Sequence, residues 1–276
     1  MTRPASDHTF SADVARIYES TLVPLIFQGY AADLANRVRA LAPAAVLEVA
    51  CGTGVVTRAL ARALPACAIT ASDLNGAMVA HAESVGTERP VTWRQADVMH
   101  LPFDDLWFDT AVCQFGVMFF PDRIAAYREI RRVLKSGGTF LFNVWRGLED
   151  NDFAAAVTEA LTLRYPDDPP LFVARTPHGH GSTAEIAREI TAAGFIDCLL
   201  DRRDDISRAA DARSAAVTYC HGTPLRNEIE SREPGGLEAA TAAVSDALRQ
   251  HYGSGPIEGR ISAIVGSARS EPGERP

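Results

Sequence analysis

Short apolar runs alternate with helical patterns between Ala44 and Trp145, and this alternation limits the possible folds more than any other feature of the sequence. Five runs have strand character: AVLEVA, AITASD, VTWRQAD, FDTAVCQF and GGTFLFNVW. The stretches between them have apolar residues at helical spacing, which predicts helices over 55–64, 76–85 and 123–134. Such an alternation implies a parallel sheet with helices on both faces.

The flanking segments extend this core. Before it, apolar residues at helical spacing predict two helices between Phe10 and Leu41, with a break at Pro24, which would form an N-terminal lid. After it, the pattern predicts helices over 152–163, 183–193, 210–220 and 237–251, and strands over 195–201 and 260–269.

The predicted fold class is therefore α/β: a Rossmann-like, seven-stranded, mostly parallel sheet with helices on both faces, an N-terminal helical lid and inserted C-terminal helices. We expect four segments. Residues 1–43 form the lid and 44–146 the core. Residues 147–269 complete the sheet and carry the inserted helices, and 270–276 form a disordered tail, as do residues 1–9.

Composition excludes several classes of protein. With 35 acidic against 27 basic residues the formal net charge is −8, so the average field repels nucleic acids. The five cysteines form no CxxC pair, which disfavours a zinc or disulfide framework. No run approaches the roughly 18 apolar residues of a membrane span, and MTRPASDHTF has no apolar stretch typical of a secretory signal. We therefore expect a cytoplasmic protein.

A glycine-bearing turn follows the first core strand. In VLEVACGTG, an apolar strand leads directly through Gly52 and Gly54 into a helix, an arrangement that lets backbone amides approach a ligand closely. A GxG turn alone is a weak signal, because it is equally typical of an ordinary strand-to-helix connection.

Two further residues refine this interpretation. Asp73 ends the second strand about 20 residues after the loop, where a carboxylate can bind both hydroxyls of a ribose; the alternative is that it caps the next helix. Thr57 stands where a dinucleotide-binding GxGxxG loop needs a small residue, which disfavours NAD or FAD.

The motifs VLEVACGTG, TASDLN, QADVMHLPF, FDTAVCQFGVMFFPD and REIRRVLKSGGTFLFNVW, in this order, resemble those of class I S-adenosylmethionine-dependent methyltransferases. The resemblance is to the subgroup similar to ubiquinone and menaquinone C-methyltransferases, and it covers residues 46–145. It implies S-adenosylmethionine as cofactor and S-adenosylhomocysteine as product.

The resemblance also implies the cofactor site. The backbone of Ala50, Gly52 and Gly54 would line the methionine portion, with Glu48 near its amino group; a salt bridge from Glu48 to a lid arginine is the alternative. Ala50 departs from the glycine common at this position. The other contacts that the resemblance implies are Asp73 at the ribose, Leu74 and Met78 at the adenine face, Asp97 and Val98 at the adenine edge, Gln114 near the methyl group, and Tyr18 at the carboxylate.

Met78, Asp97 and Tyr18 have simpler alternatives, as a core residue, a turn former and a residue of ordinary helix packing respectively. Methyl transfer from a sulfonium needs alignment and desolvation but no metal or protein nucleophile. We expect no metal site at His178 and His180, because no nearby Cys or Asp/Glu cluster in the sequence completes a coordination sphere. We assign no catalytic residue, because these histidines and His221 are more typical of surface or loop positions.

The predicted function is methyl transfer to a small, hydrophobic or aromatic metabolite, with no nucleic-acid or membrane partner and with the inserted helices as candidates for a homodimer interface. The aromatic residues of FGVMFF, with Phe153, Tyr165 and Phe172, suit such an acceptor but equally suit a core. A catalytically silent cofactor-binding protein and an NAD(P)-dependent oxidoreductase are the alternatives.

Overall fold

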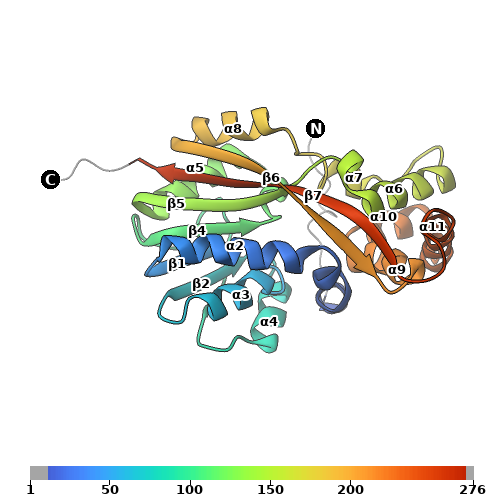
Figure 1. The fold of residues 1–276 in the computed structure, drawn as a ribbon, viewed down its shortest axis with the longest axis horizontal. Helices are drawn as coiled ribbons and strands as arrows, with labels where there is room; N and C mark the ends of the chain where they lie inside the picture. Colours follow the sequence, from blue (N-terminus) through green and yellow to red (C-terminus); the bar gives the residue numbers. More distant parts are fainter. Residues whose placement is uncertain (1–11, 272–276) are drawn as a thin grey trace. The chain divides into compact units, whose positions relative to one another are not determined.

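The structure is a computed structural model that describes residues 12–271. Its seven strands form one sheet in the order β3-β2-β1-β4-β5-β7-β6. The strands, in chain order, are β1 (Ala45–Val49), β2 (Ala68–Asp73), β3 (Thr92–Gln95), β4 (Phe108–Gln114), β5 (Leu134–Trp145), β6 (Phe195–Ala209) and β7 (Ile257–Ser270). The pairs β1–β2, β1–β4, β2–β3 and β4–β5 are parallel, and Figure 1 shows β7 running against β5 and β6. The predicted seven-stranded, mostly parallel sheet is confirmed.

The core helices begin and end close to where the sequence predicts. They are α3 (Val55–Ala63), α4 (Gly76–Val85), α5 (Arg123–Val133) and α8 (Thr183–Ala192). Each of the last three is preceded by a residue whose side chain accepts hydrogen bonds from backbone N–H groups of the first turn: Asn75, Asp122 and Ser182. Because each cap is the residue directly before its helix, the start of the helix can be predicted from the local sequence.

The chain divides into two compact units, and neither is a continuous stretch. Among the described residues, unit 2 contains 29–144, 181–202 and 264–271 and holds the core strands β1–β4 with most of β5. Unit 1 contains residues 12–28, 145–180 and 203–263 and is mainly helical. The long strands β6 and β7 have residues in both units.

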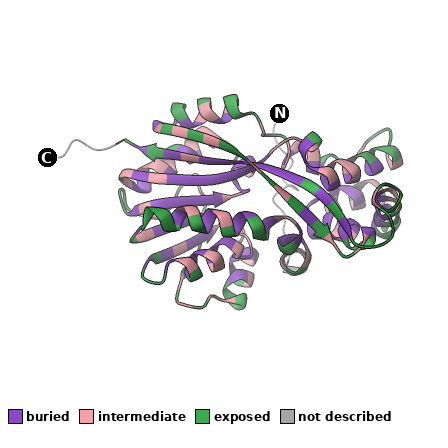
Figure 2. Ribbon diagram, viewed as in Figure 1, coloured by how far each residue is buried: buried purple, intermediate pink, exposed green. Residues whose placement is uncertain are grey.

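Both faces of the sheet in unit 2 are covered by apolar packing. On one face, Leu34 and Val38 of α2 (Gln28–Leu41) and Leu60 of α3 belong to the same buried cluster as Val46 and Val112 of the strands. On the other face, Tyr127 of α5 packs against Phe140 and Phe142 of β5, with ring centroids 5.9 and 6.4 Å apart. In Figure 2 the central strands are buried along most of their length.

Pro24 does not break the N-terminal helix, contrary to the prediction. Residues 12–41 are helical throughout: α1 (Ala12–Ile17), a π-helical segment (Tyr18–Phe27) that contains Pro24, and α2. At its end the Gln28 N–H donates to the Val23 carbonyl, five residues back, so the wider turn accommodates the proline ring. The predicted loose residues 1–9 lie outside the described residues.

Unit 1 contains the helices that follow the core. They are α6 (Asp152–Arg164), α7 (Phe172–Arg175), α9 (Ala212–Gly222), α10 (Leu225–Arg232) and α11 (Leu237–Tyr252), with short 3-10 turns at Val117–Phe119 in unit 2 and Leu148–Asp150 in unit 1. Helices α7 and α10 are short and were not predicted. Ser270, predicted as the start of a disordered tail, is the last residue of β7, and its hydroxyl donates to the Lys135 carbonyl at 2.6 Å. Residues 272–276 lie outside the described residues.

Candidate functional site

The turn between β1 and α3 has a left-handed backbone at three positions. Ala50, Gly52 and Gly54 have φ values of +53°, +53° and +85°. A Cβ on Gly54 would lie 3.0 Å from the Trp93 ring, so Gly54 is needed for both conformation and space. A Cβ on Gly52 would meet no atom within 4 Å, so open space adjoins the loop at this position.

Ala50 has a left-handed backbone conformation that favours glycine, yet it carries a methyl group. The position of this methyl group explains why residue 116 is a glycine. A Cβ on Gly116, which follows β4, would lie 2.5 Å from the Ala50 Cβ and 2.7 Å from the Cys113 Sγ. The absent side chain at Gly116 therefore makes room for the methyl group at Ala50. Sequence reasoning identified the departure at Ala50 but had no signal for its partner 66 residues along the chain.

Asp73 holds the glycine loop in place. Its Oδ2 accepts a hydrogen bond from the Gly52 N–H at 2.8 Å, and its Oδ1 accepts one from the Asn75 N–H at 2.8 Å. The cap of α4 is Asn75, whose Oδ1 accepts from Ala77 and Met78, so the capping interpretation of Asp73 is wrong. Burial raises the pKa of Asp73, while its two backbone hydrogen bonds lower it.

Glu48 is buried near the carboxyl end of β1, with 2% of its surface exposed. Its Oε2 accepts a hydrogen bond from the Thr57 hydroxyl at 2.6 Å, so its partner within residues 12–271 is Thr57 rather than an arginine. Burial raises the pKa of Glu48 to about 8; the Thr57 hydrogen bond and the charge of Arg58 lower it, and the charge of Asp73 raises it. From the sequence, Thr57 served only as evidence against a dinucleotide-binding GxGxxG loop, and its contact with Glu48 was not predicted.

The two adenine-face candidates differ in exposure. Leu74 is 56% exposed, directly after Asp73, and remains available to a ligand. Met78 is 3% exposed, which favours its alternative role as a core residue. The Leu74 side chain is therefore the better placed of the two for contact with a flat ring.

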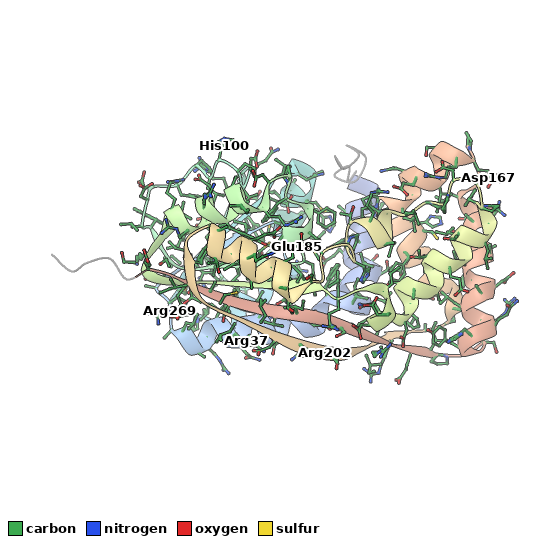
Figure 3. All side chains as sticks on the ribbon, turned by 90° about the horizontal axis from the view of Figure 1, so that it is seen from above. Arg37, His100, Asp167, Glu185, Arg202 and Arg269 are labelled. Carbon is green, nitrogen blue, oxygen red and sulfur yellow. The ribbon has the colours of Figure 1, made fainter. Side chains whose placement is uncertain are left out.

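Asp97 acts as a turn former. Its Oδ1 accepts a hydrogen bond from the Met99 N–H at 2.9 Å, and its carbonyl accepts one from the His100 N–H at 2.9 Å. This turn orients Val98, which is partly buried, while His100 points outward (Figure 3). A role at an adenine edge remains a prediction for Asp97 and Val98; the second carboxylate oxygen of Asp97 lies 4.0 Å from the His100 Nδ1.

Gln114 ends β4 directly beside Asn143 of β5. The Asn143 Nδ2 donates to the Gln114 Oε1 at 3.3 Å. Asn143 is fully buried, and its Oδ1 has no hydrogen-bond partner within the described part of the chain. Two residues earlier, the same face carries the apolar pair Val112 and Leu141, so the face changes from apolar to polar toward the carboxyl edge, where ligands bind in open α/β sheets.

Five of the predicted side chains and loop residues thus come together at one edge of unit 2: Glu48, Ala50, Gly52, Gly54 and Asp73, all joined by the β1–α3 turn and its contacts with β2. Tyr18 belongs to unit 1, where it stacks on Phe27 with ring centroids 5.3 Å apart. Its predicted contact with the cofactor carboxylate stays a prediction.

The histidines considered for substrate chemistry lie in unit 1. The Nδ1 of His178 lies 2.8 Å from the Arg146 carbonyl oxygen, so this nitrogen carries the proton, and burial lowers the pKa of His178 to about 4. The ring also packs near Trp145, with centroids 6.1 Å apart. His221 contacts the Thr241 hydroxyl at 3.0 Å.

The aromatic residues that suited either an acceptor or a core are mostly core. Phe153 and Phe172 are 0% and 2% exposed, and Phe115 packs edge-on against Tyr30 of α2 at 5.3 Å. The Tyr165 hydroxyl donates to Glu233 at 2.8 Å. These residues therefore do not by themselves define an acceptor site.

Comparison with known proteins finds similarity over the same region. The family described as methyltransferase domain matches residues 47–142. A ubiquinone/menaquinone biosynthesis C-methyltransferase of Caulobacter sp. (strain K31) is 34% identical over 129 residues, which cover 44% of this chain and 48% of the relative. A demethylmenaquinone methyltransferase of Lactiplantibacillus plantarum is 40% identical over 97 residues, which cover 33% and 41%. The chain spans about half the length of the curated relatives it matches.

Solved structures share the fold at low sequence identity. The YcgJ protein of Bacillus subtilis aligns with a TM-score of 0.56 at 20% identity, covering 87% of this chain and 99% of that protein. Phosphoethanolamine N-methyltransferase 2 of Haemonchus contortus, solved with S-adenosylhomocysteine, aligns with a TM-score of 0.59 at 16% identity, covering 96% and 59%. At these identities the likeness concerns the fold alone.

Proposed function

We propose that this chain, whose residues 47–142 belong to the methyltransferase domain family, is a class I S-adenosylmethionine-dependent methyltransferase that acts on a small-molecule acceptor. The observation that carries the proposal is the conformation of the glycine loop. Asp73, at the end of the neighbouring strand β2, fixes this loop by accepting a hydrogen bond from the Gly52 N–H. The family match covers this loop, Asp73 and the strands that position both.

The residues present fit such a cofactor. The Thr53 Oγ1, inside the loop, is buried and has no hydrogen-bond partner within residues 12–271. A carboxylate offers about four acceptor positions, and Asp73 uses one on each oxygen for backbone N–H groups, which leaves capacity for ribose hydroxyls. Glu48 offers a buried carboxyl group that a cationic amine would stabilise in its charged form.

When bound, the cofactor supplies a methyl group on a positively charged sulfur, so the leaving group needs no further activation. The chain's own residues then bind and orient: the loop amides and Asp73 fix the nucleoside and methionine portions, and Gln114 faces the carboxyl edge from β4. Holding the two reactants in line removes most of the entropic cost of their encounter.

We infer that the acceptor is a small hydrophobic or aromatic metabolite. One curated relative is named as a C-methyltransferase of ubiquinone and menaquinone biosynthesis, and another as a demethylmenaquinone methyltransferase. The family match covers residues 47–142, which contain the glycine loop and Asp73, so it supports the reaction class more strongly than the acceptor.

Turnover tests this proposal. The purified chain is incubated with S-adenosylmethionine and a panel of demethylated quinones, phenols, carboxylic acids and amines, and S-adenosylhomocysteine formation is measured. Acceptor-dependent formation with an aromatic or hydrophobic member supports the proposal. Cofactor binding without turnover on any member would instead favour a catalytically silent binding protein.

A further inference from the structure

Thr57 makes an unusual contact for a threonine inside a helix. Such a hydroxyl commonly donates to the carbonyl four residues earlier, here Thr53. In this chain the Thr53 carbonyl accepts from the Arg58 guanidinium at 2.7 Å, and the Thr57 hydroxyl donates to the Glu48 Oε2 at 2.6 Å instead. Thr57 is fully buried, so this hydrogen bond is shielded from water.

The contact fixes one half of the Glu48 carboxyl group. Oε2 is held by Thr57, whereas Oε1 accepts no hydrogen bond from any described residue. Glu48 lies two residues before Ala50, where the left-handed loop begins, so its carboxyl group is positioned at the start of the loop. A buried carboxyl group with one oxygen held and one unengaged is suited to a single cationic partner.

We propose that Thr57 is a positioning residue, whose hydroxyl holds Glu48 so that its second oxygen receives the ammonium group of the bound S-adenosyl ligand. This assignment rests on the function proposed above. It adds to that function a residue of α3 that does not itself touch the ligand.

The groups around Glu48 give this arrangement a pH signature. Arg58 on α3 favours the charged carboxylate and Asp73 at the end of β2 opposes it. The thiols of Cys51 in the loop and Cys113 on β4 have raised pKa values and stay neutral at physiological pH.

Because burial raises the pKa of Glu48 to about 8, its carboxyl group holds a proton at pH 7 before ligand binds. An ammonium group stabilises the carboxylate and lowers that pKa, so ligand binding releases the proton into solution. Removing the Thr57 hydrogen bond takes away an interaction that lowers the pKa of Glu48, so the release shifts to higher pH.

Calorimetric titration with S-adenosylhomocysteine measures this release directly, when repeated between pH 6 and 9 in buffers of different ionisation enthalpy. We expect the wild-type chain to release a proton near pH 7 and Glu48→Gln to release none from this site. Subtracting the proton release of Glu48→Gln from that of the wild type therefore leaves out protons that come from the ligand. Thr57→Val should shift the release upward by about one pH unit and weaken binding about tenfold at pH 7. Thr57→Ser keeps the hydroxyl and should restore both.

Thr158→Val is the matched control, because the Thr158 hydroxyl makes the ordinary bond to the carbonyl four residues back, at Ala154. It should bind like the wild type. Circular dichroism and thermal melting establish that each variant is folded, and Thr57→Ala replaces Thr57→Val if the latter does not fold. A pH profile of Thr57→Val or Thr57→Ala that coincides with the wild type overturns the proposal, whereas absence of wild-type binding overturns the proposed function itself.

Discussion

The carboxylate of Asp73 and the backbone N–H of Gly52 are joined by a hydrogen bond of 2.8 Å that ties the end of β2 to the loop after β1. One residue therefore fixes the conformation of the loop and offers acceptor positions to a ligand beside it. Because the same carboxylate also holds the Asn75 N–H, its own orientation is set before any ligand binds. Such preorganisation reduces the entropic cost of binding.

Asp73→Ala should weaken binding of S-adenosylhomocysteine by about 1–3 kcal/mol, through loss of charge-assisted hydrogen bonds and loosening of the loop. Calorimetric titration measures the change. Asp109→Ala is the matched control, because Asp109 also accepts two backbone N–H groups, from Ala44 and Ala45, but at the opposite edge of the sheet. Equal losses in the two variants would show that Asp73 acts only through general stability.

The raised pKa of Glu48 predicts a pH dependence of stability in the ligand-free chain. The folded protein keeps the Glu48 proton up to about pH 8, whereas the unfolded chain loses it near pH 4.5, so the folded state binds more protons between these values. Stability therefore falls as pH rises through this window, with a slope of at most about 1.4 kcal/mol per pH unit from this group.

Glu48→Gln should remove this slope and be more stable than the wild type at pH 8. Urea denaturation at pH 6.5, 7.25 and 8 measures it. The comparison uses this upper part of the window because His178, whose pKa is lowered to about 4, contributes an opposite slope between pH 4 and 6.5. Parallel stability curves for the two proteins would contradict burial of a protonated Glu48.

The fit of Ala50 beside Gly116 predicts energetic coupling. Gly116→Ala should destabilise the wild-type chain by about 1–3 kcal/mol, since the new Cβ would lie 2.5 Å from that of Ala50. In an Ala50→Gly background the same change should cost less, although contact with Cys113 remains. A double-mutant cycle from urea denaturation tests this, and a coupling energy below about 0.5 kcal/mol would contradict it.

Substitution of Asn143 should weaken ligand binding while changing the stability of the fold little. Its Oδ1 is buried without a partner in the described chain, so Asn143→Leu removes an unsatisfied polar atom and should change the unfolding free energy by no more than about 1 kcal/mol. The same change removes the hydrogen bond from Asn143 to the Gln114 side chain and should weaken binding of S-adenosylmethionine. Thermal melting and calorimetric titration are carried out on the same variant. A lower affinity at an unchanged melting temperature supports the prediction, whereas a fall in both would show a variant that is merely destabilised.

Local signals in the sequence predicted most of unit 2. The strands from β1 to β5 and the helices α3, α4, α5 and α8 begin within a few residues of the predicted positions, because each has a cap, a glycine or a change of apolar spacing at its ends. The helix across Pro24 was missed, because a π-helical turn depends on packing and leaves no signature in apolar spacing. The short helices α7 and α10 have too few turns to show a period.

The sequence named candidate site residues but not the contacts that the structure shows among them. The motifs pointed to Glu48 and Asp73, but the partners Thr57, Gly52 and Asn75 follow only from the folded arrangement of β1, β2 and α3. Neither the position of Asn143 beside Gln114 nor the space at Gly116 could be inferred, since residues far apart in the chain become neighbours only when the strand order is known. Within residues 12–271, no helix combines the length and apolar character needed to cross a bilayer.

Calorimetric titration of the wild-type chain with S-adenosylmethionine, S-adenosylhomocysteine, NAD and NADP in one buffer tests the central claim most directly. We predict saturable binding of the first two at a stoichiometry of about one ligand per chain, and none of the nicotinamide cofactors. Binding of NAD or NADP alone, or of none of the four, would contradict a methyltransferase built on the Asp73–Gly52 loop.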